Sequence, residues 1–398
     1  MSVDIATPFP LINIAQQFAH HGIVMSVNPL GSGNINSTFL VKVRPAAIGL
    51  ASSTTPAKFV LQRINAQVFR QPRLVIQNMV VLSEHLKAQG ASLDRRWEIP
   101  TILPTQSGEN YWRDSTGEYW RAISFIENAQ TLETVQSLAH AEEVGSGLAM
   151  FHSLISTLDP NDLADTLEGF HITPNYLADY QRSHSKAKDL KFKDLKAKDL
   201  TNATHLDPIT EIEQRQYCSN FIAQRQSWAH VLEDAKASGQ LQLRPIHGDP
   251  KINNILIGQN GQAVSLIDLD TLKPGLIHYD IGDCLRSGCN RLGEETEDWQ
   301  NVVFDIDLAK AILRGYLSLA SDFLTEPDYD YLYDSIRLLA FELGLRFFTD
   351  YLAGDIYFKV KHRRHNLTRA LVQFKLAESI EQQADQLKGI IQELRANT

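Results

Sequence analysis

The chain has 398 residues, which predicts two domains or two lobes and excludes a small binding module. Hydrophobic residues make up 43% and charged residues 21%, so the chain can bury a large core and is not disordered as a whole. A net charge of −9 offers no basic excess, which argues against a general nucleic-acid or acidic-membrane binder.

The cysteines and the start of the chain indicate a compartment. Cys218, Cys284 and Cys289 have no C-x-x-C spacing, so they fit neither a disulfide framework nor a zinc site, and we expect buried thiols in a reducing environment. The first residues lack the basic segment of a signal peptide, and no run of 18 apolar residues occurs. These features predict a cytoplasmic protein without a membrane-spanning helix.

The first 127 residues are predicted to form a lobe that is mostly β with one long helix. The expected elements are a helix over 11–21, strands over 23–30 and 38–43, a loop over 45–56, a strand over 58–64, a helix over 72–89 and strands near 99–104, 110–113 and 118–125. The first two strands flank the glycine-rich segment GSGNIN at 31–36, which predicts a glycine-rich hairpin.

From residue 128 to 398 helical periodicity predominates, so we place the second lobe there. Residues 186–200 are three copies of K-x-K-D-L. A period of five advances about 500° around a helix, so the leucines build no apolar stripe. We interpret the segment as a solvated insertion, with a partner-docking element as the alternative.

Near the C-terminus, apolar residues recur at steps of three and four, which predicts a helix with one apolar face. They are Leu376, Ile380, Ala384, Leu387, Ile391 and Leu394. Packing onto its own lobe is the favoured interpretation, and formation of a homodimer is the alternative.

The segment from His247 to Asp283 is the most informative part of the chain. Two β-rich runs, 255–257 and 264–267, flank Asn260-Gly261, a strong signal for a two-residue hairpin turn. With that pair at the centre of the turn, Leu256 faces Ser265 across the hairpin.

The same register brings Asn254 and Asp268 together at the open end of the hairpin, with Asp249 five residues upstream of Asn254. A carboxylate and an amide oxygen suit a hard cation such as Mg²⁺. The remaining carboxylate, Asp249, would accept a proton from an attacking hydroxyl, as phosphoryl transfer requires. Taken singly, each residue also fits a turn or a surface acid.

This set of residues resembles the catalytic and metal loops of the protein-kinase-like superfamily, and the form H-G-D-x-x-x-x-N with I-D-x-D and Y-D is similar to its aminoglycoside phosphotransferase branch. The resemblance implies a two-lobed α+β fold with ATP and Mg²⁺ between the lobes. It implies that Asp249 is the catalytic base, that Asn254 and Asp268 hold Mg²⁺, that His247 supports the loop and that Lys251 neutralises the transferring phosphoryl group.

Other runs resemble N-acetylhexosamine 1-kinases, which phosphorylate the anomeric hydroxyl of N-acetylglucosamine or N-acetylgalactosamine. These runs are GSGNINSTF, FVLQRIN, NNILIG, IDLDTLKPG, YDIGD, RFFTDYLAGDIYFK and HNL-x-RA, and the resemblance spans about residues 20–395 except the insertion. The implied substrate is an amino sugar. The alternatives are a kinase of the same fold for an aminoglycoside, choline, homoserine or another sugar, and a non-catalytic nucleotide-binding scaffold.

Two features of the first lobe bear on nucleotide binding. The glycine-rich segment lies between two strands, as in kinases, so Ser32, Gly33 and Asn34 are expected to contact phosphate. The kinase lysine of the third strand is replaced by Gln62. Either Gln62 contacts phosphate without charge, or Arg63 reaches round from the other face, or the cation comes from elsewhere.

A few further residues complete the sequence-based hypothesis. Arg346 and Tyr357 are the candidates for holding the sugar, by forked hydrogen bonds and by stacking. Asp270 is either a second metal ligand or a structural acid. Asp280 is expected to anchor the catalytic loop, and His152 to be a hydrogen-bonded core histidine.

Overall fold

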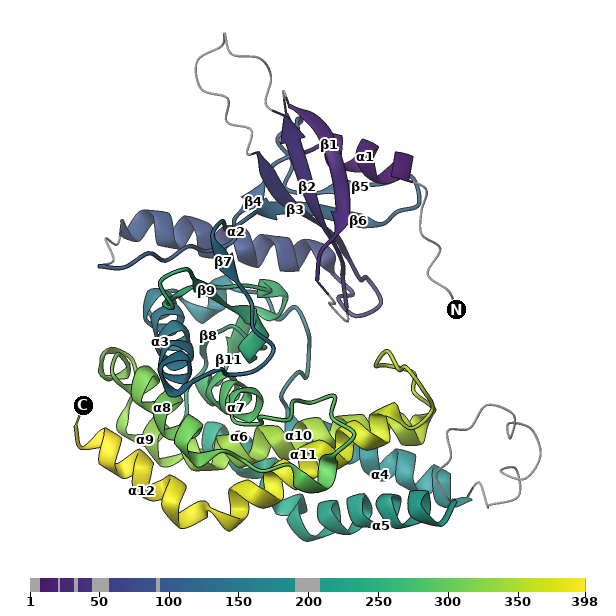
Figure 1. Ribbon diagram of the computed structural model, residues 1–398, viewed down its shortest axis with the longest axis vertical. Helices are drawn as coiled ribbons and strands as arrows, with labels where there is room; N and C mark the ends of the chain where they lie inside the picture. Colours follow the sequence, from purple (N-terminus) through teal and green to yellow (C-terminus); the bar gives the residue numbers. More distant parts are fainter. Residues whose placement is uncertain are drawn as a thin grey trace.

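The computed structural model describes residues 8–20, 22–31, 35–44, 57–90, 94–189 and 208–397. They form two lobes, one built on an antiparallel sheet and a larger one that is mainly helical, which confirms the predicted α+β architecture (Figure 1). The phosphate-contacting residues expected at 32–34, the whole predicted loop at 45–56 and the K-x-K-D-L residues 190–200 lie outside the described residues.

The first-lobe sheet has the strand order β1-β2-β3-β6-β4, with β5 also paired to β6. The strands are β1 Ile23–Pro29, β2 Ser37–Arg44, β3 Lys58–Ile64, β4 Ile102–Leu103, β5 Trp112–Arg113 and β6 Tyr119–Ser124. Helix α1, Pro8–Gln16, begins earlier than predicted, whereas α2, Pro72–Gln89, has the predicted bounds.

Strand β3 is buried on both of its faces because two layers cover it. Phe59 and Leu61 pack with Phe18, which follows α1, while Val60 packs with Met79 of α2. Successive side chains of a strand alternate between faces, so Gln62 shares the α2 face with Val60. Helix α2 lies between the sheet and the second lobe (Figure 1), and this arrangement directs Gln62 toward the boundary between the lobes.

After β6 the chain enters the second lobe, where short strands carry the loops of interest. Strand β7, Ala129–Gln130, pairs with β9, Ile255–Gly258, which pairs with β10, Ala263–Leu266. A separate ladder joins β8, Arg244–Ile246, to β11, Lys273–Gly275. The boundary at residue 127 stays a prediction.

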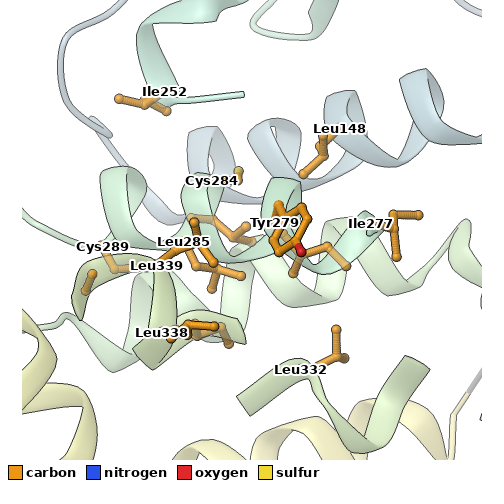
Figure 2. Close-up of a cluster of buried hydrophobic side chains, with 14 of the residues drawn as sticks. Leu148, Ile252, Ile277, Tyr279, Cys284, Leu285, Cys289, Leu332, Leu338 and Leu339 are labelled. Atoms are coloured by element: carbon orange, nitrogen blue, oxygen red, sulfur yellow. The ribbon is translucent and has the colours of Figure 1, made fainter. Parts of the chain in front are cut away.

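The second lobe is a helical assembly around α7, Ile277–Gly288, whose residues are almost all buried. Figure 2 shows side chains of α7 packed with those of α3 and α10. The other helices are α3 Leu138–Ile155, α4 Thr173–Asp189, α5 Pro208–Arg225, α6 Val231–Ala237, α8 Ile306–Leu317, α9 Glu326–Asp330, α10 Leu332–Ala353, α11 His365–Gln382 and α12 Ala384–Arg395.

Helices α3 and α8 cross closely at two glycines. A Cβ on Gly145 would lie 1.9 Å from the Ile312 carbonyl oxygen, and one on Gly315 would lie 1.9 Å from the Glu142 carbonyl oxygen. Only glycine permits this approach of α3 to α8. Helix α3 also contacts β9 and β10 of the hairpin.

The single C-terminal helix predicted through 376–394 is wrong, because α11 ends at Gln382 and α12 begins at Ala384. The Gln383 side chain donates to the carbonyl oxygens of Phe304 and Ser379 at the break. The apolar face is nevertheless buried: Leu387 and Ile391 pack within this lobe, where α12 contacts α8 and α10. Packing on its own lobe is thus confirmed, and this face is not free to form a homodimer.

The three cysteines are buried and unbridged, as expected. Within the part of the chain that the structure describes, every helix is too short or too polar to cross a membrane.

Candidate active site

A carboxylate of α7 holds the backbone of the loop that carries Asp249. Asp280 accepts hydrogen bonds from the backbone N–H of His247 at 2.7 Å and of Gly248 at 2.8 Å, and it contacts the ring of His152 at 2.9 Å. These contacts confirm the expectations for Asp280 and His152. Gly248 has φ +87°, and a Cβ there would lie 2.6 Å from the Thr271 carbonyl oxygen, so the loop requires glycine at this position.

His247 ties the loop to the β10 side of the hairpin. Its Nε2 donates to the Ile267 carbonyl oxygen at 2.8 Å, and its Nδ1 accepts from the backbone N–H of Asp249 at 3.2 Å. This arrangement requires a neutral ring. Burial lowers the pKa of His247, which agrees with the neutral form.

Asp249 is partly open to solvent and faces a cation. Its side chain is 30% exposed, and the Lys251 Nζ donates to it at 2.8 Å. Burial alone would raise the pKa of Asp249, but the charge and hydrogen bond of Lys251, together with the charge of Arg286, outweigh this effect, so the pKa lies below its usual value. Asp249 is therefore ionised at neutral pH, as a proton acceptor must be.

The hairpin has the predicted register next to the loop but a different turn. Ser265 pairs with Leu256, as predicted. The two-residue turn is wrong: Ala263 pairs with Ile257, and Gly258 N–H donates to the Gln262 carbonyl oxygen at 2.8 Å. Gly261 has φ +82°, the left-handed position of a longer turn that ends in a bulge, so the irregularity is absorbed at the turn.

At the open end of the hairpin, Asn254 and Asp268 converge as predicted. The Ile267 N–H donates to the Asn254 carbonyl oxygen at 2.9 Å, and the Asn254 Nδ2 donates to the Asp249 carbonyl oxygen at 2.7 Å. Asp268 follows directly, with φ +65° in the left-handed region. Asn254 is thus hydrogen-bonded to the Asp249 carbonyl oxygen through its side chain and to Ile267, the neighbour of Asp268, through its backbone.

The Asp268 carboxylate is the third acidic group of this site. Its side chain is open to solvent, yet the surrounding protein removes part of its hydration, and together with the negative charge of Asp270 this raises the pKa of Asp268 to about 6. Among the described residues, no hydrogen bond or ion pair engages this carboxylate. A bound cation would relieve both effects.

The donor set fits Mg²⁺ in the way a nucleotide-dependent site requires. The described residues contain no group of three or more His, Cys, Asp or Glu side chains that could enclose a metal. One carboxylate and one amide oxygen are instead typical of Mg²⁺, which completes its coordination with water and substrate phosphates.

In the first lobe, an arginine that was not predicted from the sequence lies beside Gln62. Arg121 of β6 lies opposite Gln62 of β3 in the sheet, is fully buried, and forms an ion pair with Asp270. Arg63 lies on the other face, where it contacts Ser37 and the ring of Trp120. Asp270 is thus a structural acid. The missed signal was a charge in the middle of the apolar strand YWRAIS.

The two residues proposed for the sugar lie near each other and near the catalytic loop. The Arg346 guanidinium is 5.0 to 5.5 Å from the ring centroids of Phe170, Tyr176 and Phe358. Burial would lower the pKa of Arg346, but nearby oxygens, including those of Tyr357 and Asp249, raise it overall. Arg346 therefore shares an electrostatic environment with the candidate base.

The segment that carries Tyr357 rises from the helical lobe between α10 and α11 (Figure 1). The Asp350 carboxylate accepts three successive backbone N–H groups, those of Ile356, Tyr357 and Phe358, at 2.9 to 3.0 Å. This fixes the base of the segment, while Tyr357 itself is 47% exposed. Tyr357 is therefore held in place with its ring available to a ligand.

A second missed residue, His171, connects the catalytic loop to α10. Its Nε2 is 2.8 Å from the Gly248 carbonyl oxygen and its Nδ1 is 2.8 Å from the Glu342 carboxylate. Both partners only accept, so both ring nitrogens carry hydrogen and the ring is charged. Burial alone would lower the pKa of His171, but the charge of Glu342 and the hydrogen bonds to Glu342 and to the Gly248 carbonyl oxygen together outweigh this effect, so the pKa is raised. No sequence spacing links residues this far apart.

Comparison with known proteins identifies the family of the chain. The chain matches the phosphotransferase enzyme family, APH, over residues 26–326. It belongs to this family. The chain is thus a small-molecule phosphotransferase with the two-lobed, protein-kinase-like fold.

Solved structures of low sequence identity share the fold over nearly their whole length. An aminoglycoside phosphotransferase from Alicyclobacillus acidocaldarius has a TM-score of 0.56 at 16% identity, covering 100% of this chain and 97% of its own. A choline kinase from Cryptosporidium parvum has a TM-score of 0.57 at 13% identity, covering 96% and 98%. A spectinomycin phosphotransferase, solved with ADP and spectinomycin, has a TM-score of 0.54 at 11% identity, covering 95% and 100%.

Proposed function

We propose that the protein is an ATP- and Mg²⁺-dependent kinase that phosphorylates the C1 hydroxyl of an N-acetylhexosamine. The observation that carries the proposal is the convergence of Asp249, Lys251, Asn254 and Asp268, with an ionised Asp249 next to a cation. ATP as the phosphoryl donor is supported by this arrangement and by the ADP complex of the structurally similar spectinomycin phosphotransferase.

In this mechanism Asp249 orients the C1 hydroxyl and accepts its proton as the oxygen attacks the γ-phosphorus. Lys251 holds Asp249 ionised and faces the negative charge that develops on the transferring group. Asn254 and Asp268 would hold Mg²⁺, which would neutralise the β- and γ-phosphates. Ser32, Gly33 and Asn34 would cover the phosphates, and Gln62 contributes on the nucleotide side through its hydrogen bonds with Arg121.

The amino sugar is favoured over cationic acceptors by the charge beside the base. Arg346 is permanently positive and would repel the ammonium groups of choline or an aminoglycoside. A guanidinium donates to hydroxyl and acetamide oxygens, and Tyr357 offers a ring on which a sugar face can pack. The resemblance to N-acetylhexosamine 1-kinases includes the run that contains both residues.

The test is ADP release from Mg²⁺–ATP with N-acetylglucosamine, N-acetylgalactosamine, glucose, galactose, choline, homoserine or kanamycin as acceptor. We expect turnover with the N-acetylated sugars and none with the two cationic compounds, choline and kanamycin. Turnover with another compound would keep the phosphotransferase and replace the substrate. Absence of turnover with the whole panel would favour the non-catalytic scaffold.

A further inference from the structure

A buried ion pair joins the two lobes two residues after Asp268. Arg121 of β6 contacts Asp270, which lies in the short helix Leu269–Thr271, and the two side chains are 1% and 4% exposed. Asn36, which immediately precedes β2, donates to the other oxygen of the same carboxylate. A single carboxylate of the second lobe therefore receives two donors from the first lobe.

The remaining contacts of Arg121 show how it is oriented. Its Nε and Nη2 donate to the Gln62 Oε1 at 3.0 and 2.7 Å, and its Nη1 lies 3.1 Å from the Met79 Sδ on α2. Gln62 in turn donates to the Thr38 hydroxyl at 3.2 Å. The guanidinium is thus held by the sheet, and the residue of α2 that faces it is a methionine.

This arrangement differs from that of protein kinases, in which a lysine of the third strand pairs with a glutamate of the following helix. Here the strand contributes Gln62, the helix contributes Met79, and the charge of Arg121 is balanced by Asp270 of the second lobe. The ion pair thus acts across the lobes and not within the first lobe.

The backbone after Asp268 is held by residues of both lobes. The Thr166 hydroxyl donates to the Asp270 carbonyl oxygen at 2.9 Å, and the Asn78 Nδ2 of α2 donates to the Leu272 carbonyl oxygen at 2.8 Å. Asp268 is in the left-handed region, a conformation that persists only where its surroundings enforce it. The contacts of Asp270 supply that constraint.

We propose that Arg121 and Asp270, oriented by Gln62, form a positioning pair that sets the Asp268 carboxylate and so couples Mg²⁺ binding to contact between the lobes. The inference rests on the proposed role of Asp268 as a metal ligand. The third strand has Gln62 where protein kinases have a lysine, and the cation beside it is Arg121 of β6. In this proposal Arg121 acts through Asp268 and does not contact the nucleotide directly.

Calorimetry of ADP binding with and without Mg²⁺ tests this pair without any acceptor. In the unmodified protein Mg²⁺ should tighten ADP binding. In Arg121→Met and in Asp270→Asn this enhancement should fall at least about tenfold, while ADP binding without Mg²⁺ stays within about threefold. The matched control is Arg63→Met, which removes an arginine from the opposite face of the same sheet and should keep the enhancement.

A double variant covers the case in which a single variant fails to fold, because removing one partner leaves a buried charge unpaired. Arg121→Met with Asp270→Leu removes both charges, and it should lose the enhancement to the same extent as a single variant. An unchanged enhancement in this double variant would overturn the proposal. Equal weakening of ADP binding with and without Mg²⁺ in the variants would also overturn it, since that result indicates direct contact between Arg121 and the nucleotide.

These results are separable from failure of the proposed function. If Mg²⁺ has no effect on ADP binding in the unmodified protein, the metal role of Asp268 fails and this inference fails with it. If Mg²⁺ acts in the unmodified protein and in all variants alike, only the inference fails. The identity of the sugar affects neither outcome.

Discussion

The catalytic loop and the nucleotide-facing part of the first lobe are built in different ways. Asp249, Lys251 and Asn254 lie within six residues of one another and are connected by hydrogen bonds inside that segment. Gln62, Arg121 and Asp270 come from three distant segments and meet only because strands pair and lobes touch. Local spacing in the sequence therefore identifies the catalytic residues, whereas only the tertiary structure shows that Arg121 lies beside Gln62 and Asp270.

If the spacing of the catalytic loop reflects its chemistry, substitution of the base Asp249 should have the largest effect on kcat. Asp249→Asn should lower kcat about 1,000-fold, because an amide cannot accept the proton of the attacking hydroxyl. ADP release with N-acetylglucosamine measures this. ADP binding, followed by calorimetry as the control, should stay nearly unchanged, and near-normal turnover would remove Asp249 from the mechanism.

Substitution of Lys251, which pairs with Asp249, should have the next largest effect on kcat. Lys251→Met should lower kcat about 100-fold. Because the Lys251 charge holds the pKa of Asp249 low, its loss raises that pKa, and the acidic limb of the pH profile of kcat/KM should move to higher pH. Lys251→Arg keeps the charge and serves as the control. An unshifted limb in Lys251→Met would show that the pair does not tune the base.

Arg346 and Tyr357, the residues proposed to bind the sugar, form a third region that can be tested separately. Arg346→Met should raise the KM for the sugar about tenfold or more, because it removes charged hydrogen-bond donors, and should leave the KM for ATP unchanged. Steady-state kinetics with either substrate varied separates the two. Arg346→Lys keeps the charge but loses the paired donors of the guanidinium. Its KM for the sugar should lie between those of the unmodified protein and of Arg346→Met. A parallel rise in both KM values would place Arg346 outside the acceptor site.

The backbone of the catalytic loop can be tested against a matched glycine. Gly248→Ala should lower the free energy of unfolding by about 1–3 kcal/mol or more, since it adds a clash with the Thr271 carbonyl oxygen to an unfavourable φ. Gly261 has a similar positive φ but no atom within 4 Å of an added Cβ, so Gly261→Ala measures the φ effect alone. Equal losses in denaturant unfolding would show that the clash is relieved.

The smallest expected effect concerns the buried pair of His171 and Glu342. The folded protein raises the pKa of His171 above its ordinary 6.5, so the stability from this ionisation is fully present below that value and is lost as the pH rises through the folded pKa. The stability difference between the unmodified protein and His171→Gln should therefore shrink as the pH rises above about 6.5. Thermal unfolding measures it, and a difference independent of pH would contradict a charged His171.

What the sequence predicted follows the same division between local and distant contacts. The two-lobed fold, α2, β3 and the pairing of Leu256 with Ser265 followed from periodicity and short spacings. The break at Gln383 was missed because the apolar pattern runs through it unchanged, so only the side-chain amide and its carbonyl partners mark it. The hairpin turn was missed because Asn-Gly fits turns of more than one length.

The residues that were missed depend on contacts across large sequence distances. His171 reaches the Gly248 carbonyl oxygen and Glu342, and Arg121 reaches Asp270, through packing that no spacing encodes. The replacement of the expected lysine by Gln62 left three possibilities open: Gln62 without a charge, Arg63, or a cation from another element. Strand register places the guanidinium-bearing residue Arg121 opposite Gln62.

The most direct test of the central claim uses N-acetylglucosamine labelled with ¹⁸O at C1 and phosphorus NMR of the product formed with Mg²⁺–ATP. Attack of the C1 oxygen on the γ-phosphorus predicts a sugar 1-phosphate in which the label is retained on the oxygen that bridges C1 and phosphorus. A product phosphorylated at another hydroxyl, or loss of the label, would contradict the assigned reaction.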